Sequence, residues 1–374
     1  MPHLRNISMN MINDDLAPPM IFGTLPDKLA WAELDWLHDL PGNNFFGLWL
    51  RGFDPDLPKG YDNYILSYHM ERFHWEWIRE QAKNIDGRII IINDGLPYDN
   101  FDQLPNVDFY TFHSWHFQLQ QIHELFPKIP EKQQKYKVSA INNRVTDNKL
   151  IIFTAIMELI EDKSLVKLSD WIEPKNVNWY KETGYPILDQ LTETFRQKYE
   201  GNTILLDNFL VTREENHLKN RQRYNSDPFS IALTDAALHF CLESYHYSYM
   251  IDDYGKYTRA GPHLSEKTLK CLLGETAFIP VSQFDVYNQL QQLGFMFDYG
   301  PLDLSFDRDP GNLSRLVKIV ELCKTINIYS IEELLHYTKE SSKHNREHII
   351  SEDFGNLCKQ TNEQTANKII TELS

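Results

Sequence analysis

Short apolar runs alternate with segments of helical periodicity along the first third of the chain. Residues 45–50, 64–67 and 88–92 form such runs, each bounded by Gly, Asp or Asn. Residues 71–83, between the second and third runs, place apolar side chains at helical spacing. Strands that alternate with helices of this length predict βαβ units and a parallel sheet. Residues 89–92 are apolar without alternation, which is typical of a strand covered on both faces.

The alternation continues with a strand at 107–112, a helix at 115–126, a strand at 137–141 and a long apolar helix at 148–160. It then blurs between about 170 and 223, where prolines and mixed charges predict a linker with one or two helices. After the linker, strand, helix, strand and helix are expected at 229–234, 265–273, 277–281 and 285–293. Two amphipathic segments and a polar tail from Lys339 complete the chain.

A chain of 374 residues exceeds the usual size of a single hydrophobic core, so we expect two domains. The predicted fold class is α/β. An N-terminal α/β domain is expected at 1–168, a linker or helical segment at 169–225, and a C-terminal α/β domain with a helical tail at 226–374.

Charge and cysteine usage narrow the class of protein. The net charge of −16 argues against broad, sequence-indifferent binding to nucleic acid. The four cysteines are widely spaced and form no CxxC pair, which favours a reducing compartment over a zinc site or a disulfide framework. Apolar runs of 18 residues and a charged-then-apolar N-terminus are both missing from the sequence, so we expect a cytoplasmic protein without membrane insertion.

The segment 261–294 carries the strongest chemical signal. Ser265 is suited to cap a helix that begins there, and Glu266 lies in its first turn, where the helix dipole favours an anion. Lys267 is unexpected, because the same dipole disfavours a cation unless a negative group lies in front of it. A phosphate would be held there by amides, dipole and ammonium together. The segment predicts a nucleotide-diphosphate site; the alternative is an ordinary capped surface helix.

Several motifs occur in an order that resembles the fucosyltransferase-type glycosyltransferases and their bacterial and viral relatives. The similar segments are KVSAINNR at 137–144 followed by Lys149, FSIALTD at 229–235, HLSEKT at 263–268, FIPV at 278–281 and LQQLGFMF at 290–297. Two positions differ from the family pattern, since Ser265 stands where the family has Thr and Lys149 where it has Arg.

The resemblance implies two Rossmann-like domains in a GT-B arrangement, with the nucleotide sugar held mainly by the C-terminal domain and the acceptor mainly by the N-terminal one. It implies a metal-independent and inverting transfer of the sugar to an acceptor hydroxyl, in the host cytoplasm if the protein is viral. The donor-binding residues that it implies are Arg144, Lys149, Thr234, Asp235, Ser265, Glu266 and Lys267.

The chemistry of sugar transfer gives these residues physical roles. The departing diphosphate needs its charge neutralised, and basic side chains with a helix N-terminus supply this without a metal cofactor. Arg144 suits a bidentate contact, Lys267 a point charge, and Glu266 could accept from ribose hydroxyls. The alternative for Arg144 is a surface ion pair.

A base must also deprotonate the acceptor hydroxyl. Asp94 is the first candidate, because it follows a buried strand at the edge where doubly wound sheets bind ligands. His69 and Glu71 are the other candidates. Asp94 could instead be a turn residue before Gly95.

Two other functions stay open. One is a non-catalytic nucleotide- or glycan-binding protein on the same fold. The other is a metal-dependent hydrolase that would use the histidine-rich N-terminal half, although its HxxH lacks the Glu of a zinc protease. Those histidines are His69, His74, His113, His116 and His123.

The acceptor also stays open. It could be a glycan, a metabolite, a protein or a hydroxymethylated base in phage-type DNA. For DNA, the basic cluster between Arg213 and Arg223 could contact phosphates, but the overall acidity favours a charged helix face there.

Overall fold

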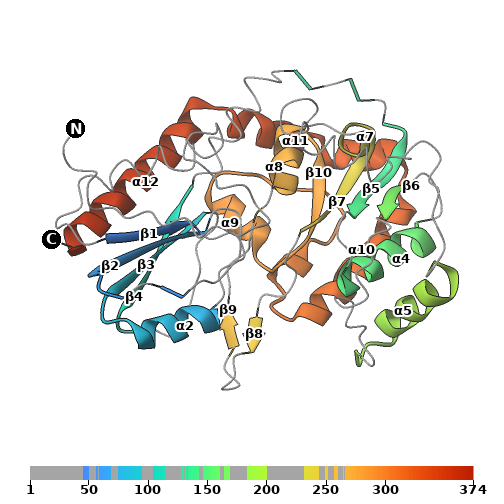
Figure 1. The fold of residues 1–374 in the computed structure, drawn as a ribbon. Helices are drawn as coiled ribbons and strands as arrows, with labels where there is room; N and C mark the ends of the chain where they lie inside the picture. Colours follow the sequence, from blue (N-terminus) through green and yellow to red (C-terminus); the bar gives the residue numbers. More distant parts are fainter. Residues whose placement is uncertain are drawn as a thin grey trace, which may run out of the picture. The chain divides into compact units, whose positions relative to one another are not determined.

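The computed structural model describes residues 45–49, 56–57, 59–68, 75–94, 104–113, 128–129, 131–132, 134–142, 146–160, 164–168, 183–199, 231–243, 249–251, 257–259, 264 and 266–373. These residues form an α/β protein with two parallel four-stranded sheets (Figure 1). The chain divides into two compact units, one of Met1–Gln118, Tyr249–His263 and Glu352–Ser374, the other of Leu119–Ser248 and Leu264–Ser351. The predicted α/β class with parallel sheets is confirmed.

The first unit contains a sheet whose strands follow the chain order. Its strands are β1 (Phe45–Trp49), β2 (Asn63–Tyr68), β3 (Arg88–Asp94) and β4 (Val107–Phe112), and all neighbours are parallel. Helix α2 (Trp75–Asn84) connects β2 to β3. Ile89 and Ile91 pack in a core with Trp77 and Ile78 of α2, whereas Ile90 and Ile92 belong to a second core. β3 is therefore covered on both faces, as its unbroken apolar run predicts.

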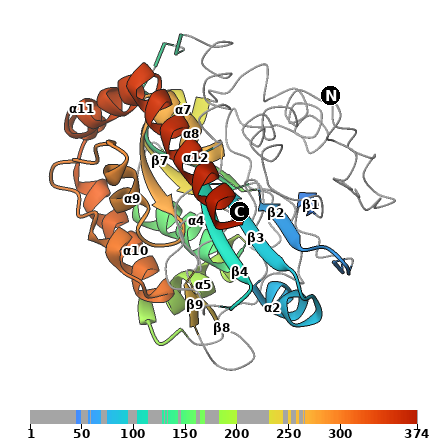
Figure 2. The ribbon, with the colours of Figure 1, turned by 90° about the vertical axis from the view of Figure 1, so that its left-hand side faces the viewer.

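The C-terminal helix α12 (Glu352–Leu373) covers the other face of this sheet (Figures 1 and 2). Ala366 and Ile369 pack against Ile90 and its neighbours. Arg88 at the beginning of β3 donates through Nη2 to Glu372 Oε2 over 2.9 Å. The polar tail thus contributes its few apolar side chains to the core of the N-terminal sheet.

The second unit contains a sheet in the order β10-β7-β5-β6, again with all neighbours parallel. Its strands are β5 (Tyr136–Asn142), β6 (Ser164–Leu168), β7 (Ala236–Leu242) and β10 (Ala277–Val281). Helix α4 (Asp147–Leu159) connects β5 to β6, and α8 (Glu266–Leu273) precedes β10. The connection from β5 to β6 and the connection from β7 to β10 run in opposite directions along the sheet. Because such connections are right-handed, α4 and α8 lie on opposite faces of the sheet.

The helices of this unit pack in two groups. α4 contacts α5 (Pro186–Lys198) and α10 (Asn312–Ile328), which explains why its side chains are buried all round from Asp147 to Ile156. α11 (Ile331–Ile349) contacts α8, β7 and β10, and a capping box of Ser330 and Glu333 begins it. The remaining described elements are α7 (Ile231–Thr234), β8 (Tyr249–Ile251), β9 (Tyr257–Arg259), α9 (Val286–Gln292) and the 3₁₀ helix η3 (Ser305–Arg308).

The structure differs from the sequence analysis at three points. The strand predicted at 229–234 is wrong: α7 occupies residues 231–234, and the strand is β7 at 236–242. Both stretches are apolar without alternation, so periodicity does not distinguish them. The helix predicted at 148–160 is α4 at 147–159, but the strand β6 at 164–168 was not predicted. The β8–β9 hairpin was not predicted.

The division of the chain also differs from the expected boundaries. Residues 136–168, which the sequence analysis assigned to the N-terminal domain, form β5, α4 and β6 and pair through β5 with β7. The compositional change after residue 168 therefore does not mark the end of a sheet. The helix predicted at 115–126 lies outside the described residues.

His239 of β7 is a buried histidine whose titration should affect stability. Its Nδ1 lies 2.8 Å from Ser139 Oγ of β5, and burial lowers its pKa from 6.5 to about 4. Between these two pH values the unfolded chain binds the proton and the folded chain does not, so stability falls as pH falls from 6.5 to about 4. We expect a loss of roughly 3 kcal/mol over that interval.

Urea unfolding of the wild type and of His239→Asn across this pH range measures the effect. Burial raises the pKa of Asp307 to about 7, and this opposing contribution cancels in the difference because both proteins carry it. The difference in unfolding free energy should change with pH in the stated direction. A difference that stays constant from pH 4 to 6.5 would show that His239 is protonated equally in both states.

Candidate functional site

The carboxyl edge of the second sheet contains a topological switch point. From β5 the chain crosses over to β6, and from its neighbour β7 it crosses over to β10 on the other side. Open α/β sheets bind ligands in the crevice between two such strands, because their following loops diverge there. α4 begins at this edge five residues after β5 ends (Asn142, Asp147), and α8 begins there beside β7, as the contacts below show.

Glu243, directly after β7, lies beside the beginning of α8. Glu243 is 1% exposed to solvent. Thr268 Oγ1 donates to Glu243 Oε1 over 2.6 Å, and Lys267 Nζ lies 3.9 Å from Glu243 Oε2. Cys241 Sγ lies 3.7 Å from Glu243 Oε1. The negative group that a lysine in the first turn of α8 requires is therefore present in the protein itself.

The first turn of α4 forms the other side of the crevice and is unusually polar for a buried segment. Asp147, Asn148 and Lys149 are all buried. Asp147 Oδ1 accepts a hydrogen bond from the backbone N–H of Asn148 over 2.8 Å, and Thr146 Oγ1 donates to the side-chain oxygen Oδ1 of Asn148 over 2.6 Å. Asn148 Nδ2 is buried and has no hydrogen-bond partner among the described residues. A buried amide donor at a helix N-terminus is matched by an acceptor such as a phosphate oxygen.

Arg315 of α10 supports the same edge of the sheet beside β10. Its side chain is 1% exposed, and its Nε donates to the carbonyl oxygen of Ser282, directly after β10, over 3.2 Å. Nη1 donates to Asp309 O over 2.8 Å and Nη2 to Asn312 Oδ1 over 3.3 Å. The guanidinium thus joins the end of β10 to the loop before α10.

Two of the predicted donor-binding residues lie at the carboxyl edge of the second sheet, and two others lie at its amino edge. Lys149 and Lys267 lie in the first turns of the two helices that border the switch point. Thr234 and Asp235 precede β7 and lie at the amino edge, where Asp235 O accepts from the Tyr136 amide over 2.9 Å. Placing them at the carboxyl end of a strand was wrong, because the strand begins after Asp235 and ends before Glu243.

Other predicted site residues lie outside the described residues or are described by their backbone alone. The first group comprises His69, Glu71, Arg144 and Ser265. Asp94 is the last residue of β3, opposite Phe112 of β4, and Glu266 is the first residue of α8. Arg144 belongs to the segment that joins β5 to α4 in the sequence.

Sequence reasoning missed Glu243 and Asn148. The signal for Glu243 was available, since the run AALHFCL is unbroken and apolar and ends at an acidic residue. Asn148 gave no such signal, because an asparagine near the beginning of a helix is ordinary.

Metal ligands and membrane spans were also sought among the described residues. In the ranges that the structure describes, three or more His, Cys, Asp or Glu side chains do not gather in a way that could hold a metal ion. Those ranges include His113 but not His69, His74, His116 or His123. None of the described helices is long and apolar enough to cross a membrane.

Comparison with known proteins gives no relative. No protein-family model, curated protein or solved structure matches the chain.

Proposed function

We propose that the protein is a metal-independent glycosyltransferase that binds a nucleotide sugar at the carboxyl edge of the second sheet. The observation that carries this proposal is the switch point between β5 and β7, where α4 begins with a buried polar first turn and α8 begins with Lys267 beside the buried Glu243. Helix N-termini and lysines suit the diphosphate of such a donor. Asn148 Nδ2, which has no partner among the described residues, supplies a further donor.

The roles of the individual side chains follow from their chemistry. Lys149 and Lys267 provide positive charge at the beginnings of α4 and α8, and Arg144, between β5 and α4 in the sequence, is suited to a bidentate phosphate contact. Lys267 Nζ lies 3.9 Å from Glu243 Oε2, so the ammonium and the carboxylate lie close together at the beginning of α8. Glu243 is a carboxylate acceptor for a ribose or sugar hydroxyl in the same crevice.

The motif order that resembles the fucosyltransferase-type enzymes supports the same proposal. Three of its segments correspond to β5, the beginning of α8 and β10, all in the second unit. Two parallel sheets in separate units are compatible with two Rossmann-like domains, and we propose a GT-B arrangement on that basis. The acceptor, held by the N-terminal domain in this proposal, is a glycan, a metabolite or a hydroxymethylated DNA base, with inversion at the sugar carbon.

A thermal-shift screen against GDP-, UDP-, CMP- and dTDP-sugars tests the proposal. A ligand that binds only the native state raises its stability by mass action, by roughly 2.7 kcal/mol at a hundred times its Kd. One nucleotide class should raise the melting temperature and the others should not. If all four leave it unchanged, the proposed donor site is wrong. A non-catalytic binding protein on this fold would pass the screen but fail a sugar-transfer assay.

Transfer should persist in excess EDTA. In the proposed mechanism basic side chains and helix N-termini neutralise the departing diphosphate, so a divalent ion has no required role. The measurement is the initial rate of transfer with and without EDTA, followed by addition of Mg²⁺ or Mn²⁺. Loss of turnover in EDTA that a divalent ion reverses would contradict the metal-independent mechanism.

A further inference from the structure

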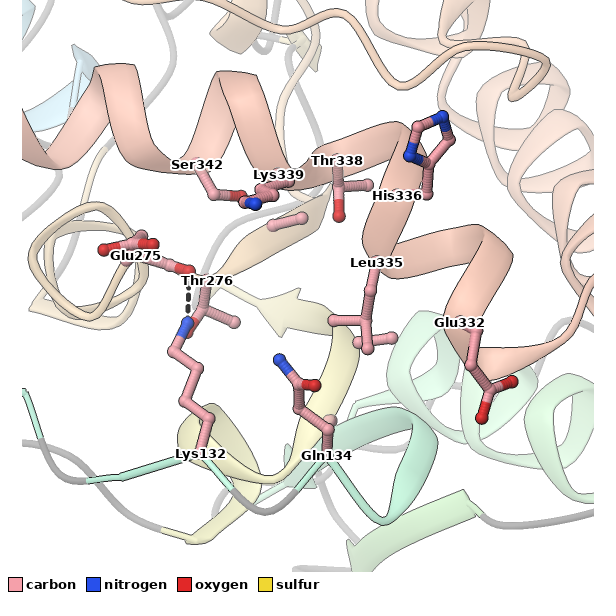
Figure 3. Close-up of a pocket in the computed structure, with 13 residues that line it drawn as sticks. Lys132, Gln134, Glu275, Thr276, Glu332, Leu335, His336, Thr338, Lys339 and Ser342 are labelled. Carbon is pink, nitrogen blue, oxygen red and sulfur yellow. Dashed lines mark hydrogen bonds between the residues drawn. The ribbon is translucent and has the colours of Figure 1, made fainter.

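A pocket of about 330 Å³ lies at the amino edge of the second sheet, the edge opposite the switch point (Figure 3). Ala236 and Ala237 at the beginning of β7 and Ala277 at the beginning of β10 line it, and α11 lies across it. Because these three side chains are small, space for the pocket remains at the amino ends of the two neighbouring strands. Sites for small molecules begin at roughly this size.

Two donor groups in this pocket lack the acceptors that they need. Lys132 Nζ donates to the carbonyl oxygen of Glu275, and this is its one hydrogen bond among the described residues. Ser342 of α11 is 7% exposed, and its hydroxyl has no hydrogen-bond partner in the described part of the chain. An ammonium has three donors and a hydroxyl one. Figure 3 shows the two side chains coming from opposite walls of the pocket.

Charges of both signs surround Lys132. Burial lowers the pKa of the Lys132 ammonium to about 8, because the group has lost water without gaining an equivalent set of acceptors. The Glu275 carboxylate, which lines the same pocket, raises the pKa of the ammonium, and Arg346 lowers it. Gln134 adds an amide beside Lys132, and Lys339 of α11 is a second cation in the lining. The Glu332 carboxylate points away from the other lining side chains in Figure 3.

A purely structural role accounts for only part of this arrangement. Lys132 and Arg346 donate to the carbonyl oxygens of Glu275 and Leu273 at the end of α8, as cations commonly do at helix C-termini. That role uses one of the three donors of Lys132 and none of Ser342. Both residues line the pocket.

We propose that this pocket binds a small metabolite carrying a carboxylate or phosphoryl group, with Lys132 and Ser342 as its donors and the alanines against its apolar part. The site lies at the opposite edge of the sheet from the proposed nucleotide-sugar site. The proposal therefore does not depend on the glycosyltransferase assignment, and the two can fail separately.

Calorimetry with inorganic phosphate and with succinate tests the proposal on the full chain. Saturable binding of either probe is expected, and the probe that binds distinguishes the phosphoryl from the carboxylate source. Lys132→Met should weaken binding roughly tenfold or more, because a charge-assisted hydrogen bond is lost. Lys324→Met, which removes an exposed lysine of α10 that pairs with Glu321, should bind like the wild type.

A second variant, Ser342→Ala, tests the proposal if Lys132→Met fails to fold. The hydroxyl that Ser342→Ala removes bonds to no described residue, so its loss should not disturb the fold. Ser342→Ala should weaken binding while leaving the melting temperature unchanged. Bound probe should also slow acetylation of Lys132, measured by mass spectrometry of its peptide, and leave Lys324 unaffected. The proposal is overturned if neither probe binds saturably below roughly 10 mM, or if Ser342→Ala binds as tightly as the wild type.

Discussion

Asp94→Asn is expected to slow sugar transfer by roughly 10²–10⁴-fold, the usual cost of removing a general base. Asp94 is the last residue of β3, and the apolar core of that strand fixes its backbone at the carboxyl edge of the first sheet. A carboxylate at this edge is in the position where parallel sheets present ligand-binding groups. Asn is nearly the same size but cannot accept the proton of the acceptor hydroxyl.

Asp86→Asn is the matched control for this variant. Asp86 is exposed and lies two residues before β3, at the amino edge of the same strand, so its amide variant should turn over at the normal rate. Nucleotide-sugar binding should be unchanged in both variants, because the proposed donor site lies in the second unit. If Asp94→Asn retains near-normal turnover, the role of base passes to Glu71 or His69.

Arg315→Met should destabilise the second unit by roughly 2–6 kcal/mol, because two buried or partly buried carbonyl oxygens lose their donors at about 1–3 kcal/mol each. The substitution leaves the carbonyl oxygens of Ser282 and Asp309 without their guanidinium donors inside the protein. Each buried acceptor without a partner costs about 1–3 kcal/mol. The Met side chain replaces most of the volume, so the loss reports hydrogen bonding more than packing. Denaturant unfolding measures it.

Lys318→Met on the same helix is the control. Lys318 Nζ pairs with Asp309 Oδ2 over 2.8 Å, but its side chain is 47% exposed, and exposed pairs of this kind contribute about 1 kcal/mol or less. Equal losses in the two variants would mean that the carbonyl oxygens around Arg315 find water or other donors when it is removed.

The sequence predicted most elements whose periodicity is local. β4 and β10 have the predicted bounds, and β3 has the predicted two-sided burial. The parallel pairing also followed, because strands that alternate with helices leave few other topologies. The extent of α11 and α12 did not follow, since their polar faces hide apolar side chains such as Ile369 that meet a sheet encoded far earlier in the chain.

The residues of the candidate site were likewise predicted only where the signal lay in the neighbouring sequence. Lys149 and Lys267 were found from their places beside predicted helix beginnings, which is local information. Glu243 was missed because the strand was placed one element too early, so Asp235 took its role in the prediction. The contacts of Arg315 depend on residues distant in sequence such as Ser282. The burial of polar side chains such as Asn148 cannot be read from their neighbours in the chain.

The most direct test of the proposed donor site is calorimetry of the nucleotide sugar selected by the thermal-shift screen. It compares the wild type with Lys267→Ala, Arg144→Ala and the control Lys270→Ala, which lies in the last turn of α8. Loss of a charge-assisted phosphate contact should weaken binding by about 1.5–3 kcal/mol in the first two variants. Lys270→Ala should bind like the wild type. Unchanged affinity in both Lys267→Ala and Arg144→Ala would contradict the diphosphate site at the switch point.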